Sequence, residues 1–155
     1  MKKASNLFFW ILTLQVVGFL IGMLTKQDIA SWYVYLKKSP ISPPSLAFPI
    51  AWTILYVTIA IAGFLLFNGK SNRHLFYAKL FFIIQLLMNW LWTPLFFTFH
   101  HISLAFYWIL FILFFTFLTI FFAYEKCNTV SLILIPYFLW LIFACYLNFF
   151  ILMHN

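Results

Sequence analysis

Five long apolar segments, separated by short polar ones, make up most of the chain. They cover about residues 7–24, 46–68, 74–99, 103–124 and 130–153. Each has about 18 residues or more, which is the length that a helix needs to cross a hydrocarbon core of about 30 Å. A transmembrane β-barrel would instead show segments of about ten residues with alternating polarity. The pattern therefore predicts an all-α integral membrane protein, a bundle of five transmembrane helices in a single domain over residues 1–155.

The longest polar segment, residues 25–45, separates the first two apolar segments. Four of the six prolines of the chain fall between residues 40 and 49. Proline removes a backbone donor and displaces the residue before it from helical geometry. We therefore expect residues 25–45 to form a semi-rigid lid over one end of the bundle. The lid leads directly into a helix that carries Trp52 and Tyr56.

Composition excludes a soluble fold, and the charge pattern predicts an orientation. Hydrophobic residues make up 66% of the chain and charged residues 7%, which leaves too little polar surface for a soluble domain. The net charge of +7 is spread over loops and ends, which argues against a nucleic-acid partner. Basic residues are more frequent on the side of the N-terminus, so the positive-inside rule predicts a cytoplasmic N-terminus and a lid on the opposite side. The first side holds Lys2, Lys3, Lys70, Arg73, Lys79 and Lys126, and the second holds Lys26, Lys37 and Lys38.

The apolar segments carry no charged residue at depth. Proton pumps and ion-coupled transporters place ionisable groups there, so the sequence disfavours both classes. The two acidic residues, Asp28 and Glu125, fall on opposite sides of the predicted membrane and cannot form a catalytic pair. His100 and His101 stand at a turn without a cysteine or carboxylate nearby. We therefore predict no metal site, no cofactor and no ordinary hydrolytic machinery.

Amides and aromatic residues recur at helical spacing in three of the segments. Such positions share one face of a helix, and they are Gln85, Asn89, Trp92 and Phe96 in the third segment, Trp140, Phe143, Ala144, Leu147 and Asn148 in the fifth, and Trp52 and Tyr56 in the second. Amides in hydrocarbon need hydrogen-bond partners, so we expect these faces to point inward. Two interpretations are open. The amides join helices and the aromatic residues pack between them, or the faces form an aromatic-walled cavity with a few polar anchors, the usual form of a small-molecule site.

The first segment contains a GxxxG pattern formed by Gly18 and Gly22. Small residues at this spacing let helices approach closely. The pattern is open to two interpretations, namely helix packing within one chain and a contact in a homodimer.

Several separated motifs, all in the same order, resemble those of the translocator protein family (TspO, or peripheral benzodiazepine receptor). The lid and second segment contribute Trp32-Tyr33, Leu36, Lys38, Pro43-Pro44, Trp52-Thr53 and Leu55-Tyr56. The third and fourth segments contribute the run from Asn89 to Phe97, NWLWTPLFF, and Leu104-Ala105. The fifth contributes the run from Pro136 to Trp140, PYFLW, with Phe143-Ala144 and Leu147-Asn148.

The resemblance implies a five-helix bundle, commonly dimeric, with a cavity beneath the lid that binds porphyrins, sterol-like molecules and synthetic isoquinoline or benzodiazepine ligands. By matching position, the ligand site would contain Tyr33, Pro43, Trp52, Tyr56, Asn89, Trp92, Thr93, Phe96, Trp140, Phe143, Ala144 and Leu147. The leading hypothesis is a receptor-like membrane protein that binds porphyrins or related tetrapyrroles. Two alternatives follow from the same resemblance. One is light- and oxygen-dependent degradation of the porphyrin with Trp52 and Trp140 as the reacting residues, and the other is facilitated transport of the porphyrin across the membrane.

The chain departs from the family pattern at three places. Ile41 stands where the lid of the family usually has a tryptophan, and Leu104 replaces a tryptophan of animal members. No Lys or Arg follows Lys126, so the C-terminal cholesterol pattern is absent. Sterol binding therefore has no support from the sequence.

Overall fold

The structure is a computed structural model, and it describes residues 2–69 and 72–155. Its elements are α1 (Lys2–Ser31), the 3-10 helix η1 (Tyr33–Tyr35), α2 (Ala47–Asn68), α3 (Arg73–Phe97), α4 (Ile102–Tyr124) and α5 (Asn128–His154). All five α-helices are long and apolar enough to cross a membrane. Among the described residues there is no strand. The predicted all-α bundle of five transmembrane helices is confirmed.

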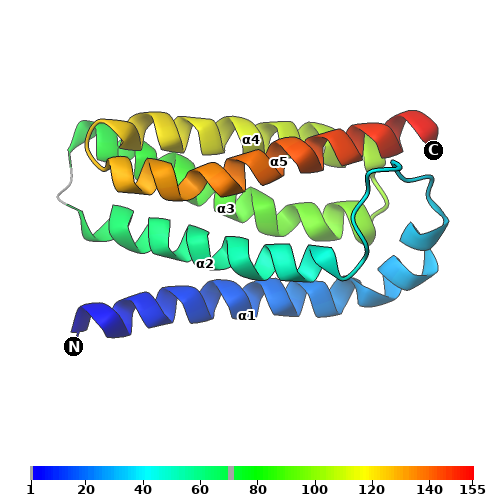
Figure 1. Cartoon of the computed structure of the whole chain (residues 1–155), viewed down its shortest axis with the longest axis horizontal. Helices are drawn as coiled ribbons and strands as arrows, with labels where there is room; N and C mark the ends of the chain where they lie inside the picture. The colour runs from blue at the N-terminus through cyan, green and yellow to red at the C-terminus, as the bar shows by residue number, and fades with distance from the viewer. Residues whose placement is uncertain (1, 70–71) are drawn as a thin grey trace.

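The five helices run side by side along the long axis of the molecule, and the two termini lie at opposite ends (Figure 1). The most extensive contacts join α3 to α4 and α4 to α5. Helix α1 packs on α2 and, over a smaller area, on α3, while α2 also packs on α5. The order around the bundle is therefore α1, α2, α5, α4 and α3.

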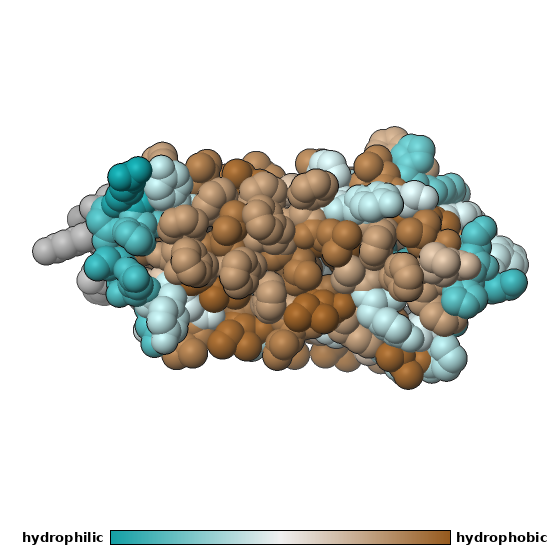
Figure 2. All heavy atoms as spheres, turned by 90° about the horizontal axis from the view of Figure 1, so that it is seen from above, coloured by the Kyte–Doolittle hydropathy of each residue, from teal (hydrophilic) through white to brown (hydrophobic). Residues whose placement is uncertain are grey.

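Apolar side chains cover the middle of the molecule, and hydrophilic ones gather at its two ends (Figure 2). Large apolar residues are exposed on several of the spanning helices, for example Phe19 of α1, Leu91 of α3 and Phe121 of α4. A soluble protein rarely exposes an apolar surface of this extent. Together with the five spanning helices, the belt identifies a multi-pass integral membrane protein.

The first helix is longer than predicted. The sequence predicted a span over residues 7–24 and a lid that begins at residue 25, but α1 continues to Ser31. Residues 25–31 contain neither proline nor glycine, and polar residues end an apolar span without ending its helix. Asp28 holds this extension in place, because its carboxylate accepts a hydrogen bond from Thr98 Oγ1 at 3.0 Å. The lid therefore begins at Trp32, and the other four helices lie within two residues of their predicted bounds.

The two glycines of the first segment have different surroundings. A Cβ atom at Gly18 would overlap the ring of Tyr56, whereas a Cβ atom at Gly22 would meet nothing within 4 Å. Gly18 is thus a packing position between α1 and α2 within one chain. Of the residues used to predict orientation, Lys70 and the side chains of Lys2 and Lys3 lie outside the part of the chain that the structure describes.

Candidate functional site

A chain of hydrogen bonds joins α2, α3 and α5 inside the bundle. Tyr56 donates its hydroxyl proton to Asn89 Oδ1 across 3.2 Å, and Asn89 Nδ2 donates to the Tyr137 hydroxyl across 3.1 Å. Tyr137 in turn donates to Gln85 Oε1 across 2.9 Å. All four side chains are buried. An unpaired polar group at such depth costs about 1–3 kcal/mol, so this hydrogen-bond chain fixes how the three helices face one another.

One aromatic group lies where the lid meets the end of α3. Trp92 stacks on Phe96 with ring centroids 5.2 Å apart and planes 10° apart, and Trp92 Nε1 donates to the carbonyl of Ala105 at 3.2 Å. Tyr33 of η1 approaches Phe96 edge-on at 6.0 Å. Burial raises the pKa of the Tyr33 phenol above its ordinary value, so its hydroxyl is neutral at physiological pH. The start of the lid is thus seated on the aromatic end of α3.

A second aromatic group lies between the lid ends of α2 and α5. Trp52 and Tyr56 have ring centroids 5.5 Å apart. On α5, Trp140 approaches Phe143 at 5.8 Å and Phe48 at 6.2 Å, both edge-on. Tyr56 connects Trp52 to the hydrogen-bond chain, so an aromatic wall and polar anchors are adjacent on α2.

The lid is fastened to α5. The backbone of Lys37 and the side chain of Asn155 exchange two hydrogen bonds, from Lys37 N to Asn155 Oδ1 at 2.9 Å and from Asn155 Nδ2 to Lys37 O at 3.1 Å. The hydroxyls of Ser39 and Tyr146 lie 3.0 Å apart. These contacts close the end of the bundle that the lid covers.

Within the lid, the side chain of Lys38 binds backbone carbonyls of the lid itself. Its ammonium donates to the carbonyls of Tyr33 and Val34 at 2.8 and 3.1 Å, and it lies 4.6 Å from the centre of the Tyr33 ring. The side chain of Lys37, in contrast, is exposed. Ile41, where the lid departs from the family pattern, is 61% exposed and is not part of the core.

The turn between α3 and α4 contacts the end of α1. His100 adopts a left-handed backbone conformation with φ of 56°, and its ring stacks on Trp32 at 4.2 Å. In the described part of the chain, no three His, Cys, Asp or Glu side chains gather as a metal site would require. This turn therefore closes the same end of the bundle by packing.

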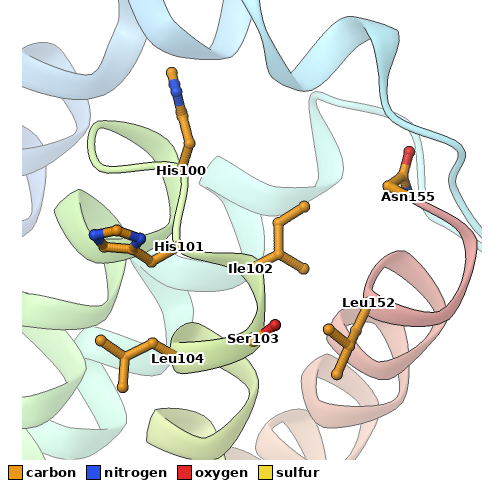
Figure 3. A pocket seen from close by; sticks show the side chains of 7 residues that line it. All are labelled: His100, His101, Ile102, Ser103, Leu104, Leu152 and Asn155. Atoms are coloured by element: carbon orange, nitrogen blue, oxygen red, sulfur yellow. The ribbon is translucent and has the colours of Figure 1, made fainter.

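Two of the hollows on the surface formed by the described residues bear on the predicted site. The first has a volume of about 480 Å³ and lies between the start of α4 and the end of α5, where His101, Ser103 and Asn155 line it (Figure 3). The second has about 440 Å³ and lies between α2 and α5, with Trp140 and Phe143 in its wall. The other ten residues predicted for the ligand site line neither hollow. The expected cavity beneath the lid is therefore not one of these two hollows, and aromatic rings pack against one another in that region.

All twelve predicted site residues lie in described parts of the chain. Tyr56, Asn89, Phe96 and Leu147 are buried, and the other eight are half-buried. Direct contacts join Tyr56 to Asn89 and to Trp52, Trp140 to Phe143, and Phe96 to Tyr33 and Trp92. No aromatic contact or side-chain hydrogen bond joins Pro43, Thr93, Ala144 or Leu147 to the other predicted residues. The structure thus places the predicted residues in three contact sets, one around Phe96, one around Tyr56 and one of Trp140 with Phe143, rather than in a single ring of twelve.

The two asparagines singled out by spacing differ in what they bind. Asn89 joins three helices, whereas Asn148 Nδ2 donates only to the carbonyl of Ala144 on its own helix, at 2.9 Å. The oxygen Asn148 Oδ1 is buried without a partner among the described residues, as are Gln85 Nε2, Trp90 Nε1 and Trp140 Nε1. Buried unpaired polar atoms are uncommon in folded proteins, and those of Gln85, Trp140 and Asn148 lie on the helix faces predicted to point inward.

Tyr137 belongs to the hydrogen-bond chain but was not among the residues predicted from helical spacing. It is fully buried and contacts both Asn89 and Gln85. Extending the face of Trp140 and Ala144 by one turn toward the N-terminus reaches Tyr137, so periodicity could have found it. The contact between Lys37 and Asn155 had no such signal, because 118 residues separate them.

Comparison with known proteins shows sequence similarity along nearly the whole chain. The profile of the TspO/MBR family matches residues 10–154. The chain is 34% identical over 146 residues to "Tryptophan-rich protein TspO" of Archaeoglobus fulgidus, covering 94% of each chain. It is 32% identical over 140 residues to the protein of that name in Chlorobaculum tepidum, covering 90% of this chain and 89% of the relative. It is 26% identical over 134 residues to "Translocator protein" of Bos taurus, covering 85% of this chain and 79% of the relative. The chain belongs to the TspO/MBR family.

Proposed function

We propose that this protein is a receptor-like membrane protein that binds a porphyrin or a related flat tetrapyrrole between α2, α3 and α5. The observation that carries the proposal is the junction at Tyr56, which contacts Trp52 through its ring and Asn89 through its hydroxyl. A flat apolar ligand needs aromatic walls, and its orientation needs a few fixed polar groups. Both kinds of group meet at Tyr56.

The positive charge of the lid favours a ligand that carries carboxylates. Lys37 is exposed beside the fastened end of the bundle, and Lys38 lies next to it. Exposed lysines attract the carboxylates of a porphyrin weakly and in a salt-dependent way. The attraction adds a small, salt-dependent part to the affinity for a bound porphyrin, and the aromatic groups supply the contact area.

Titration of the purified protein in lipid nanodiscs with protoporphyrin IX tests the proposal. Tryptophan quenching and the porphyrin absorption bands are followed together, in darkness, against empty nanodiscs of the same lipid. Saturable quenching with a matching shift of the absorption bands supports binding. A linear response equal to that of empty nanodiscs shows only partition into lipid and rules the proposal out.

Light-dependent oxidation of the bound porphyrin by oxygen is the second candidate function. The contact that favours it is again between Trp52 and Tyr56, since it places two oxidisable rings together 5.5 Å apart. Transport coupled to an ion is not favoured, because the apolar segments carry no charged residue at depth that could bind the driving ion. Exposure of the titrated sample to light in the presence of oxygen separates a binder, which leaves the porphyrin intact, from an enzyme, which consumes it.

The orientation is a further part of the proposal, with the N-terminus in the cytoplasm and the lid on the opposite side. Arg73 is the first residue of α3 and Lys126 lies between α4 and α5, so both are at the end of the bundle opposite the lid. A cysteine at exposed Ser45 of the lid, in a variant without Cys127 and Cys145, should react with a membrane-impermeant maleimide on intact cells. A cysteine at Glu125 in the same background should react only after lysis, and the reverse pattern would invert the topology.

A further inference from the structure

The lid end of the bundle is closed by specific polar contacts. A ligand arriving there would have to break the two hydrogen bonds between Lys37 and Asn155 and the contact between Ser39 and Tyr146. It would also have to separate the lid from α3, where Tyr33 is packed on aromatic rings. Among the described residues, no side-chain hydrogen bond joins α2 directly to α5. The hollow between these helices has apolar walls, and Phe48 and Trp140 meet there edge-on.

The hollow between α2 and α5 opens to the bilayer. Ile54 of α2 and Leu139 of α5 line it and are 59% and 58% exposed. Both lie within membrane-spanning helices, so their exposed side chains face lipid. A charged molecule in water has no access to this position, whereas a molecule dissolved in the hydrocarbon reaches it directly.

The inner wall of the hollow belongs to the proposed ligand site. Trp140 and Phe143 line the hollow and form part of the aromatic group between α2 and α5. Trp140 Nε1 is buried and has no acceptor among the described residues. A buried, unpaired N–H donor behind an apolar wall favours a ligand that is largely apolar but carries a hydrogen-bond acceptor on its edge, because such a ligand would pair with the donor after passing between the helices.

We propose that the hollow between α2 and α5 is an outer binding site and the entrance through which a flat apolar ligand, dissolved in the bilayer, reaches the aromatic site. The inference rests on the proposed function, because the ligand is the same. It adds the route and the physical form of the ligand, which arrives from lipid in its uncharged form. The lid then retains a bound ligand and does not admit it.

The test compares rates of binding with equilibrium affinity. The protein in phosphatidylcholine nanodiscs is mixed with vesicles that carry protoporphyrin IX or its uncharged dimethyl ester, and binding is followed at the porphyrin absorption band. Leu139→Trp narrows the hollow. Leu132→Trp is the matched control, because Leu132 lies on the same helix, is 56% exposed and does not line the hollow. Asn155→Ala unfastens the lid.

We expect Leu139→Trp to lower the association and dissociation rate constants together by about tenfold, with Kd nearly unchanged. Leu132→Trp should keep both wild-type rates. Asn155→Ala should keep the wild-type association rate while dissociation becomes faster, because the lid retains the bound ligand. The dimethyl ester should bind at least as fast as the diacid. Ile54→Trp narrows the hollow from the α2 side and should reproduce the effect, which guards against misfolding of a single variant. Wild-type rates in both folded hollow variants, or faster association in Asn155→Ala alone, would overturn the entrance while leaving porphyrin binding intact. Absence of saturable binding by the wild-type protein would instead refute the proposed function, and the entrance with it.

Discussion

Tyr56 of α2 donates a hydrogen bond to Asn89 of α3 across 3.2 Å, and both side chains are buried among apolar residues. The bond matters because Asn89 also reaches Tyr137 of α5. One amide therefore determines how three helices meet beneath the lid. The aromatic walls of the proposed site are carried by the same three helices.

Removal of the central hydroxyl should destabilise the fold. Tyr137→Phe leaves Asn89 Nδ2 and Gln85 Oε1 without their partner, and we expect a loss of about 1–3 kcal/mol in the free energy of unfolding. Tyr107→Phe is the matched control, because Tyr107 is 57% exposed on α4. Thermal unfolding in detergent, followed by circular dichroism, measures both. Equal melting temperatures for the two variants would mean that the hydrogen-bond chain does not hold the helices together.

A side chain added at Gly18 should disturb the proposed ligand site, although Gly18 is not part of that site. Gly18→Leu would push the Tyr56 ring from its place, with an overpacking cost of about 1–3 kcal/mol and weaker binding of protoporphyrin IX. Gly22→Leu is the control, since a Cβ atom there meets nothing within 4 Å. Melting temperature and size-exclusion chromatography with light scattering report on both variants. If Gly22→Leu converts a dimer to a monomer, the glycine pattern serves a homodimer at Gly22 as well as packing at Gly18.

Much of this arrangement was accessible from the sequence. Five apolar segments predicted five helices, and the spacing of Gln85, Asn89 and Phe96 predicted the buried face of α3. The end of α1 was not accessible, because a helix that leaves the membrane keeps its backbone hydrogen bonds and needs no apolar residues. The bond from Tyr137 to Gln85 depends on how α5 is rotated against α3, and periodicity within one helix does not contain that rotation. The fastening of Lys37 by Asn155 depends on where the lid crosses the end of α5.

The two lysines of the lid should affect porphyrin binding for different reasons. Lys37 is exposed, so Lys37→Ala should weaken binding at most about fivefold, and the loss should vanish at high salt. Lys38 donates to the carbonyls of Tyr33 and Val34, so Lys38→Ala should loosen the lid and speed ligand dissociation at every salt concentration. Titrations at low and high ionic strength separate the two effects. An affinity of the wild-type protein that is independent of ionic strength would contradict electrostatic attraction by Lys37.

Substitution of Trp52 and Trp140 should show whether these tryptophans only line the porphyrin site or also react with the porphyrin. Trp52→Phe and Trp140→Phe keep an aromatic ring on each side of the site, so dark binding of protoporphyrin IX should be largely retained. Any loss of porphyrin should require both light and oxygen. The described residues include no group of three His, Cys, Asp or Glu side chains, and the apolar segments contain no acid–base pair. Absorbance during illumination, compared with free porphyrin in empty nanodiscs, measures the rate. Wild-type rates in both variants would exclude the tryptophans as reactants.

The most direct measurement of the central claim compares protoporphyrin IX affinity in the wild-type protein and in Ala144→Phe. Ala144 is half-buried on α5 and packs against the core that contains Tyr56 and Tyr137. The added ring occupies space between the helices at a cost of about 1–3 kcal/mol in stability, without removing a hydrogen-bonding side chain. Ile142→Phe adds the same ring at a position that is 46% exposed on α5. We expect saturable binding in the wild type and in Ile142→Phe, and its loss in a folded Ala144→Phe. Unchanged affinity in folded Ala144→Phe would contradict a porphyrin site between α2, α3 and α5.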